Sequence, residues 1–232
     1  MSGIQSLVKA AMLDCRAEAP HRCRSAAIHE AGHALALWWN GLRIFYATVP
    51  TELESQSDMV TELNGQVQGS GASVVGKSFK LIAETLTPEI VLDTPSLAGI
   101  IHREVLICYA GPVAEAASSG ASLTDVMLRG GGQMDLQCAY DAMQVLPEAW
   151  RGLVDVTAER RARELVSRYW PAISALADLL QVAGTVGGET VNALLEVTTG
   201  ETPGFMQNAL TDLDVETQPL PADAGEGGKD GR

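Results

Sequence analysis

The feature that most constrains this chain of 232 residues is an H-E-x-x-H motif, which runs from His29 to His33. Small and apolar residues flank it, and together they favour one helix from Ser25 to about Trp39. Positions i and i+4 share a helix face, so the two histidines can offer their imidazole nitrogens to one metal ion. Glu30 stands where a carboxylate can reach a metal-activated water without binding the metal. The motif therefore predicts a metal site of the kind found in zinc-dependent hydrolases.

The balance of charge bears on partners and location. The chain has 16 Lys and Arg against 29 Asp and Glu, a net charge of −13. Nucleic acids and anionic membranes bind surfaces rich in Lys and Arg, so we expect neither as a partner. We find no basic stretch followed by an apolar run, and no run of about eighteen apolar residues. We therefore expect no signal peptide and no membrane span, and a cytoplasmic location.

Hydrophobic periodicity predicts a mainly α fold: a single helical domain at 21–200, with a small β element after the motif helix. Asn40-Gly41 should end that helix, and a strand should follow from Ile44 to Val49. Residues 66–68 form at most a weak strand. Before the domain, residues 1–20 are predicted to form an amphipathic helix. After it, residues 201–232 are an acidic tail that we expect to be disordered.

Helical spacing recurs in the later part of the chain. One largely buried helix is expected over 97–118, which either continues through Pro112 or restarts there. The glycine-rich stretch 120–132 reads as a loop, and a helix should open at Asp135. An apolar stripe over 162–180 predicts a helix kinked at Pro171, and a turn at Gly187-Gly188 should lead into a last short helix.

Residues 71–78 match the phosphate-binding pattern G-x-x-x-x-G-K-[ST]. That loop works only when it follows a buried strand and when a magnesium-binding Asp ends another apolar strand. The preceding residues are polar, and no suitable Asp follows. We interpret the match as accidental.

A catalytic zinc site needs a third protein ligand and one position for water. Asp135 stands out because it follows the glycine-rich loop and opens a helix, where the helix dipole favours a carboxylate. The alternative is that Asp135 is only an N-terminal helix residue. Spacing alone leaves the following candidates open: His21, His102, Glu104, Glu115, Asp125, Asp135 and Asp141.

Three segments resemble the FtsH-type zinc metalloprotease family. The motif helix reads Ala-Ile-His-Glu-Ala-Gly-His-Ala, Cys108–Ala116 is similar to a second family helix, and Met134–Ala139 is similar to the segment that carries its third ligand. The resemblance implies that Asp135 completes the set with His29 and His33, although Asp125 offers a rival alignment. It covers the peptidase domain only, without the AAA ATPase module. The resemblance implies that the helical domain at 21–200 is a metallopeptidase domain. The family works as a ring with an ATPase module, so the resemblance also implies that this chain could form a homo-oligomer or act with an ATPase on a separate chain.

Two hypotheses follow. In the first, the protein is a zinc metalloendopeptidase that cleaves a peptide or unfolded protein, with Glu30 as the catalytic base. In the second, it is a non-catalytic domain that keeps Zn²⁺ as a staple of the fold and binds a partner protein.

Overall fold

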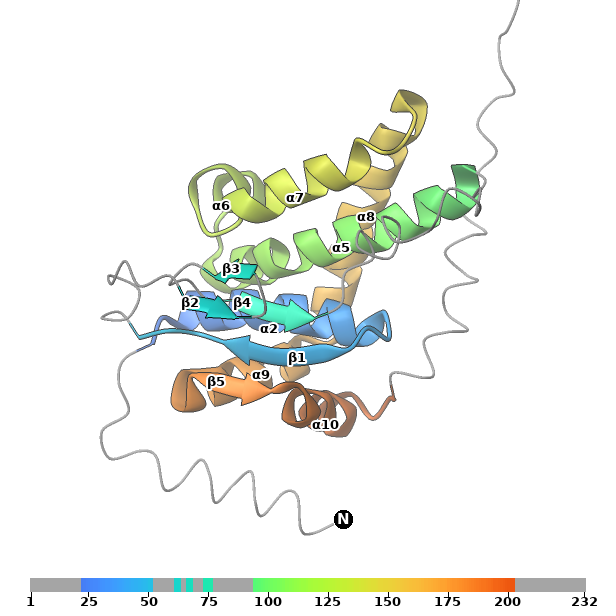
Figure 1. The fold of residues 1–232 in the computed structure, drawn as a ribbon. Coiled ribbons are helices and arrows are strands. Elements are labelled where there is room, and N and C mark those ends of the chain that lie inside the picture. Colours follow the sequence, from blue (N-terminus) through green and yellow to red (C-terminus); the bar gives the residue numbers. More distant parts are fainter. Residues whose placement is uncertain (1–21, 52–60, 64–65, 69–72, 77–93, 203–232) are drawn as a thin grey trace, which may run out of the picture.

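The computed structural model describes residues 22–51, 61–63, 66–68, 73–76 and 94–202 (Figure 1). Over these residues the protein is mainly α-helical with two small sheets, which confirms the predicted fold class at that level. The predicted N-terminal helix and almost all of the predicted tail lie outside the described residues. So does His21, one of the candidate ligands.

Helix α2 (Arg24–Trp39) is the element around which the domain is built. Almost every side chain from Ala27 onward is buried, among them Ile28 and Trp38, because the helix is apolar on nearly all sides. Figure 1 shows α2 behind strand β1 (Ile44–Thr48), with α5 (Thr94–Ser119) above it. The helix ends at Trp39, as predicted, with Asn40 as its C-cap and Gly41 following at a φ of 68°.

The main sheet has three antiparallel strands in the order β4-β1-β5. The predicted strand β1 is the central one. Its neighbours are β4 (Ser73–Gly76) and β5 (Thr185–Gly187), neither of which was predicted. A separate hairpin joins β2 (Thr61–Leu63) to β3 (Gln66–Gln68), which confirms the weak strand. Strand β4 occupies the middle of the phosphate-loop match, so residues 73–76 pair with β1 in a sheet and do not form a loop.

The long helix α5 packs against α2 on one side and α8 (Glu148–Arg168) on another. It continues through Pro112 without restarting. A Cβ on Gly32 of α2 would lie 2.5 Å from the carbonyl oxygen of Ala110 and 2.9 Å from the Cβ of Ala114. The glycine therefore allows the two helices to approach closely, and this approach brings the motif face of α2 against α5.

Two predictions for the later chain are wrong in detail. The expected loop 120–132 contains helix α6 (Leu123–Arg129), whose Ser122 hydroxyl accepts a hydrogen bond from the Asp125 amide. The expected kinked helix is two helices, because α8 ends at Arg168 and α9 (Trp170–Ala183) begins after a single intervening residue, Tyr169. The remaining helices α7 (Gln133–Met143) and α10 (Gly188–Thr199) were predicted to within a few residues.

Helix α5 bears on the expectation about membrane spans. Within the described part of the chain, Ser96–Ser119 is long and apolar enough to cross a bilayer by length and composition. However, 61% of its most apolar stretch is buried inside the protein, where α2 and α8 cover it. The central helix of a globular domain meets the same criterion.

Candidate metal centre

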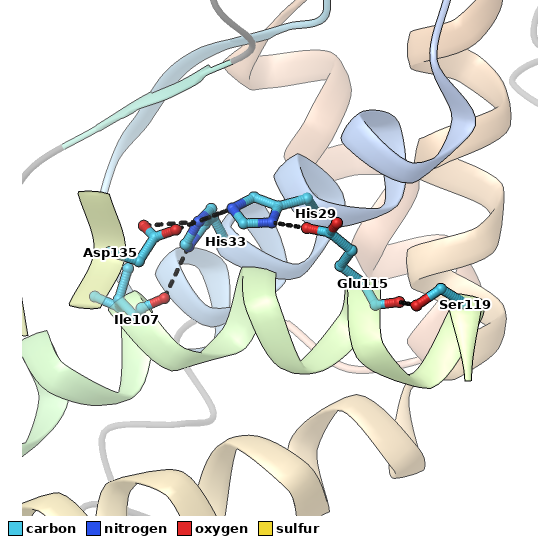
Figure 2. Close-up of polar contacts among 6 residues, drawn as sticks. All are labelled: His29, His33, Ile107, Glu115, Ser119 and Asp135. Carbon is cyan, nitrogen blue, oxygen red and sulfur yellow. Dashed lines mark hydrogen bonds and ion pairs between the residues drawn. The ribbon is translucent and has the colours of Figure 1, made fainter. Parts of the chain in front are cut away.

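Helices α2 and α7 bring His29, His33 and Asp135 to one point (Figure 2). The Nε2 atoms of the two histidines are 3.0 Å apart. Asp135 places one carboxylate oxygen 3.1 Å from Nε2 of His29 and the other 3.2 Å from Nε2 of His33. Among the described residues this is the one group of three or more His, Cys, Asp or Glu side chains that could hold a metal ion. It is the trio that the sequence singled out.

The outer ring nitrogens of both histidines are already engaged. Nδ1 of His33 lies 2.8 Å from the carbonyl oxygen of Ile107, which can only accept, so Nδ1 must carry a proton. Nδ1 of His29 lies 2.8 Å from a carboxylate oxygen of Glu115 and donates in the same way. In the neutral rings both Nε2 lone pairs therefore point at one another. Such an arrangement requires a proton or a cation between them.

The spacing of the three donor groups suits a metal ion. Metal bonds to imidazole nitrogen and carboxylate oxygen are about 2.0–2.2 Å long, which places neighbouring donors about 3.0–3.5 Å apart around the ion. The separations of 3.0, 3.1 and 3.2 Å match this range. Metal-binding histidines also commonly donate their other N–H to a carboxylate or a backbone carbonyl, as both do here. The donor set could therefore hold a metal ion.

Without a metal, the cluster holds a proton instead. Burial lowers the pKa of His29, but hydrogen bonds to Asp135 and Glu115 and the charge of Glu30 outweigh it and raise the pKa to about 10. Burial also lowers the pKa of His33, and the charge of Asp135 raises it above its usual value overall. Burial alone would raise the pKa of Asp135, yet the two histidines bring it well below its usual value.

Metal binding should therefore release protons. At pH 7 the metal-free His29 is protonated, because this pH is well below its pKa of about 10. We expect at least one proton to be released per Zn²⁺ bound, and the apparent affinity to rise about tenfold per pH unit for each proton displaced. Calorimetric titration at pH 7 in two buffers with different ionisation enthalpies measures this number. A value near zero would contradict the protonated cluster.

Glu30 lies beside the cluster and does not belong to it. Only 5% of the residue is exposed, and within the described part of the chain its carboxylate makes no hydrogen bond. Burial raises its pKa, while the positive charges of His33 and His29 act in the opposite direction. A buried carboxylate with a raised pKa and no fixed partner is suited to accepting and returning a proton.

Within the described part of the chain, the other candidate ligands lie outside the cluster. Asp125 accepts a hydrogen bond from the Ser122 hydroxyl and forms an ion pair with Arg129. His102 faces α8, where burial lowers its pKa to about 4 although a hydrogen bond to the Thr157 backbone opposes this effect. Three further candidates do not belong to the cluster of ligand atoms: Glu104, Glu115 and Asp141. Glu115 instead positions His29 from the side.

Sequence reasoning missed two parts of the site, the carbonyl of Ile107 and Gly111. A Cβ on Gly111 would overlap the His33 ring at Nε2, Cδ2 and Cε1. The one signal for this position was a Gly-Pro pair inside an otherwise apolar helix. The pair looked like a helix boundary, but the glycine provides the space in which His33 lies.

Replacing Gly111 by Ala should displace the His33 ring and weaken metal binding by at least about tenfold, since even outer-shell changes typically cost 10–100-fold. Competition with a zinc chelator measures the effect. Gly120→Ala is the control, because a Cβ there meets no atom within 4 Å, although its φ of +73° will cost some stability. Equal affinities for the Gly111→Ala variant and the wild type would contradict the contact.

No protein-family model matches the chain, and a comparison with curated proteins finds no match either. The geometry and chemistry of the site are therefore the basis on which a function can be assigned.

Proposed function

We propose that the protein is a zinc metallopeptidase, related in fold and site to the FtsH-type family that its motifs resemble. One observation carries this proposal. Two imidazole Nε2 atoms and a carboxylate surround a single point, both Nδ1 atoms are already engaged, and a buried glutamate follows the first histidine. Two histidines and a carboxylate with a neighbouring Glu are the set typical of zinc hydrolases that cleave peptide bonds.

Each side chain has a role in this proposal. Zinc in such a site polarises a peptide carbonyl and makes water acidic enough to lose a proton near neutral pH. His29, His33 and Asp135 would hold the ion. Glu115 and the Ile107 carbonyl fix the orientation of the two rings. Glu30 would accept the proton of the attacking water and deliver it to the departing amine.

The test combines metal analysis with cleavage. The purified protein should contain about one zinc per chain, and it should cleave casein or another unfolded protein in a reaction that a chelator stops and added Zn²⁺ restores. Zinc bound tightly without cleavage of any unfolded substrate would favour the non-catalytic, zinc-stapled domain. Two histidines and a carboxylate can also bind Fe(II), so the metal analysis must identify the ion. Iron in place of zinc would contradict the proposed metal.

A further inference from the structure

The hydrogen bond between His29 and Glu115 is covered by the turn that joins α6 to α7. Nδ1 of His29 lies 2.8 Å from Oε2 of Glu115 (Figure 2), and the two side chains are only 8% and 17% exposed. The covering residue is Gly131, which is itself exposed. Its backbone therefore has solvent on one side and this hydrogen bond on the other.

Gly131 approaches both partners of the bond closely. A Cβ there would lie 3.0 Å from Oε2 of Glu115 and 3.6 Å from Nδ1 of His29. These two atoms are 2.8 Å apart, so the Cβ position lies beside the hydrogen bond and within reach of both its ends. Non-bonded heavy atoms prefer separations of about 3.5–4.0 Å, so a methyl group in this position would press on the carboxylate.

The carboxylate cannot move away from such a methyl group without a consequence at His29. A shift of Oε2 changes the length or the angle of its hydrogen bond with Nδ1, and both determine the strength of that bond. The bond keeps the proton on Nδ1 and leaves Nε2 to face the candidate metal position. The space at Gly131 therefore affects the orientation of a metal ligand.

The same turn also carries the third candidate ligand. Gly131 lies two residues before α7 begins at Gln133, and Asp135 lies in the first turn of that helix. A Cβ on Gly132 would lie 2.9 Å from Cγ of Pro112, so the turn rests directly on α5. Docking of this one segment thus places a carboxylate at the cluster and covers the partner of His29.

We propose that Gly131 is a positioning residue of the metal centre, because the space it leaves lets the Glu115 carboxylate hold the His29 ring with Nε2 toward the metal. The inference rests on the metal binding in the proposed function and does not depend on peptide cleavage. A protein that binds no zinc would contradict both. Independent effects at Gly131 and Glu115 in a protein that binds zinc would contradict the role of Gly131 alone.

A double-mutant cycle on the full-length protein tests this role, with zinc affinity measured by chelator competition. Gly131→Ala should weaken zinc binding by about tenfold, at the low end of the 10–100-fold typical of outer-shell changes. Glu115→Ala vacates the crowded space. In that background, Gly131→Ala should therefore change the affinity by less than about twofold.

Gly130→Ala is the matched control. It adds a Cβ to the same turn with an equally close contact, 3.0 Å from the carbonyl oxygen of Val126 in α6. Its effect on zinc affinity should be the same with and without the Glu115 carboxylate. NMR of the His29 ring in the zinc-loaded protein gives a second readout. The Nδ1–H resonance should shift in Gly131→Ala and keep its position in Gly130→Ala.

Three results would overturn the proposal: wild-type zinc affinity in Gly131→Ala, an equal loss of affinity in both backgrounds, or an unchanged Nδ1–H resonance. If Gly131→Ala alone does not fold, thermal unfolding of the double variant with Glu115→Ala decides. A folded double variant would support crowding at Glu115. An unfolded one would show that the glycine matters only for the turn, and would contradict the proposal.

Discussion

Replacing Glu30 by Gln should lower peptide cleavage by about a hundred- to ten-thousand-fold, the usual contribution of a general acid–base group. Glutamine keeps the volume and a hydrogen-bonding oxygen but cannot accept a proton at neutral pH. The carboxylate lies outside the ligand cluster, so zinc content and thermal stability should stay close to those of the wild type. Its burial and raised pKa make the neutral amide a good structural substitute.

A comparison with His29→Ala separates the loss of the proton acceptor from the loss of the metal. The alanine variant removes a ligand and should lose both the metal and the activity. Cleavage by Glu30→Gln at the wild-type rate would exclude Glu30 as the base. Loss of zinc from Glu30→Gln would mean that the carboxylate belongs to the metal site, and the assignment of ligands would have to change.

Asp135→Ala should weaken zinc binding by more than about a hundredfold, which exceeds the 10–100-fold typical of an outer-shell partner. The carboxylate contacts Nε2 of both histidines, so its removal leaves two ligands and an open side. Asp125→Ala is a closely matched control, because Asp125 and Asp135 both lie in the first turn of a helix. Chelator competition on the two variants compares them directly.

The Asp125→Ala control distinguishes the two alignments that the sequence left open, in which either Asp135 or Asp125 is the third ligand. Asp125→Ala should keep the wild-type affinity for zinc and lose only the contacts of the Asp125 carboxylate with the Ser122 hydroxyl and Arg129. Loss of zinc from Asp125→Ala, with retention by Asp135→Ala, would support the rival alignment. It would also show that α6 and α7 are arranged differently in solution.

The parts of the site that were predictable are the local ones. The spacing of His29 and His33 on one helix follows from helix geometry alone, and the structure places both rings at one point. Asp135 was predicted through the family resemblance together with its place after a glycine-rich loop. Spacing could not decide between Asp135 and Asp125, because both open a helix. A Ser-x-x-Asp pattern at Ser122 marked the N-terminus of α6, and the three glycines that follow concealed it.

The parts that were missed depend on contacts between distant segments. The Ile107 carbonyl and Gly111 act through α5, and nothing in their own neighbourhood indicates which face of that helix meets His33. Strand β5 looked like a turn because its partner β1 lies well over a hundred residues earlier in the chain. Packing between distant elements overrides local preference at such positions.

The separation of the ligands along the chain affects when the site can form during synthesis. His29 and Asp135 are 106 residues apart. At about 5–20 residues per second, a ribosome adds Asp135 about 5–20 s after His29. During that interval the nascent chain carries His29, Glu30 and His33 without the third candidate ligand or the helix that holds it. The candidate metal site therefore cannot assemble until α7 has emerged and docked, and on the proposed function translation itself would delay peptide cleavage until then.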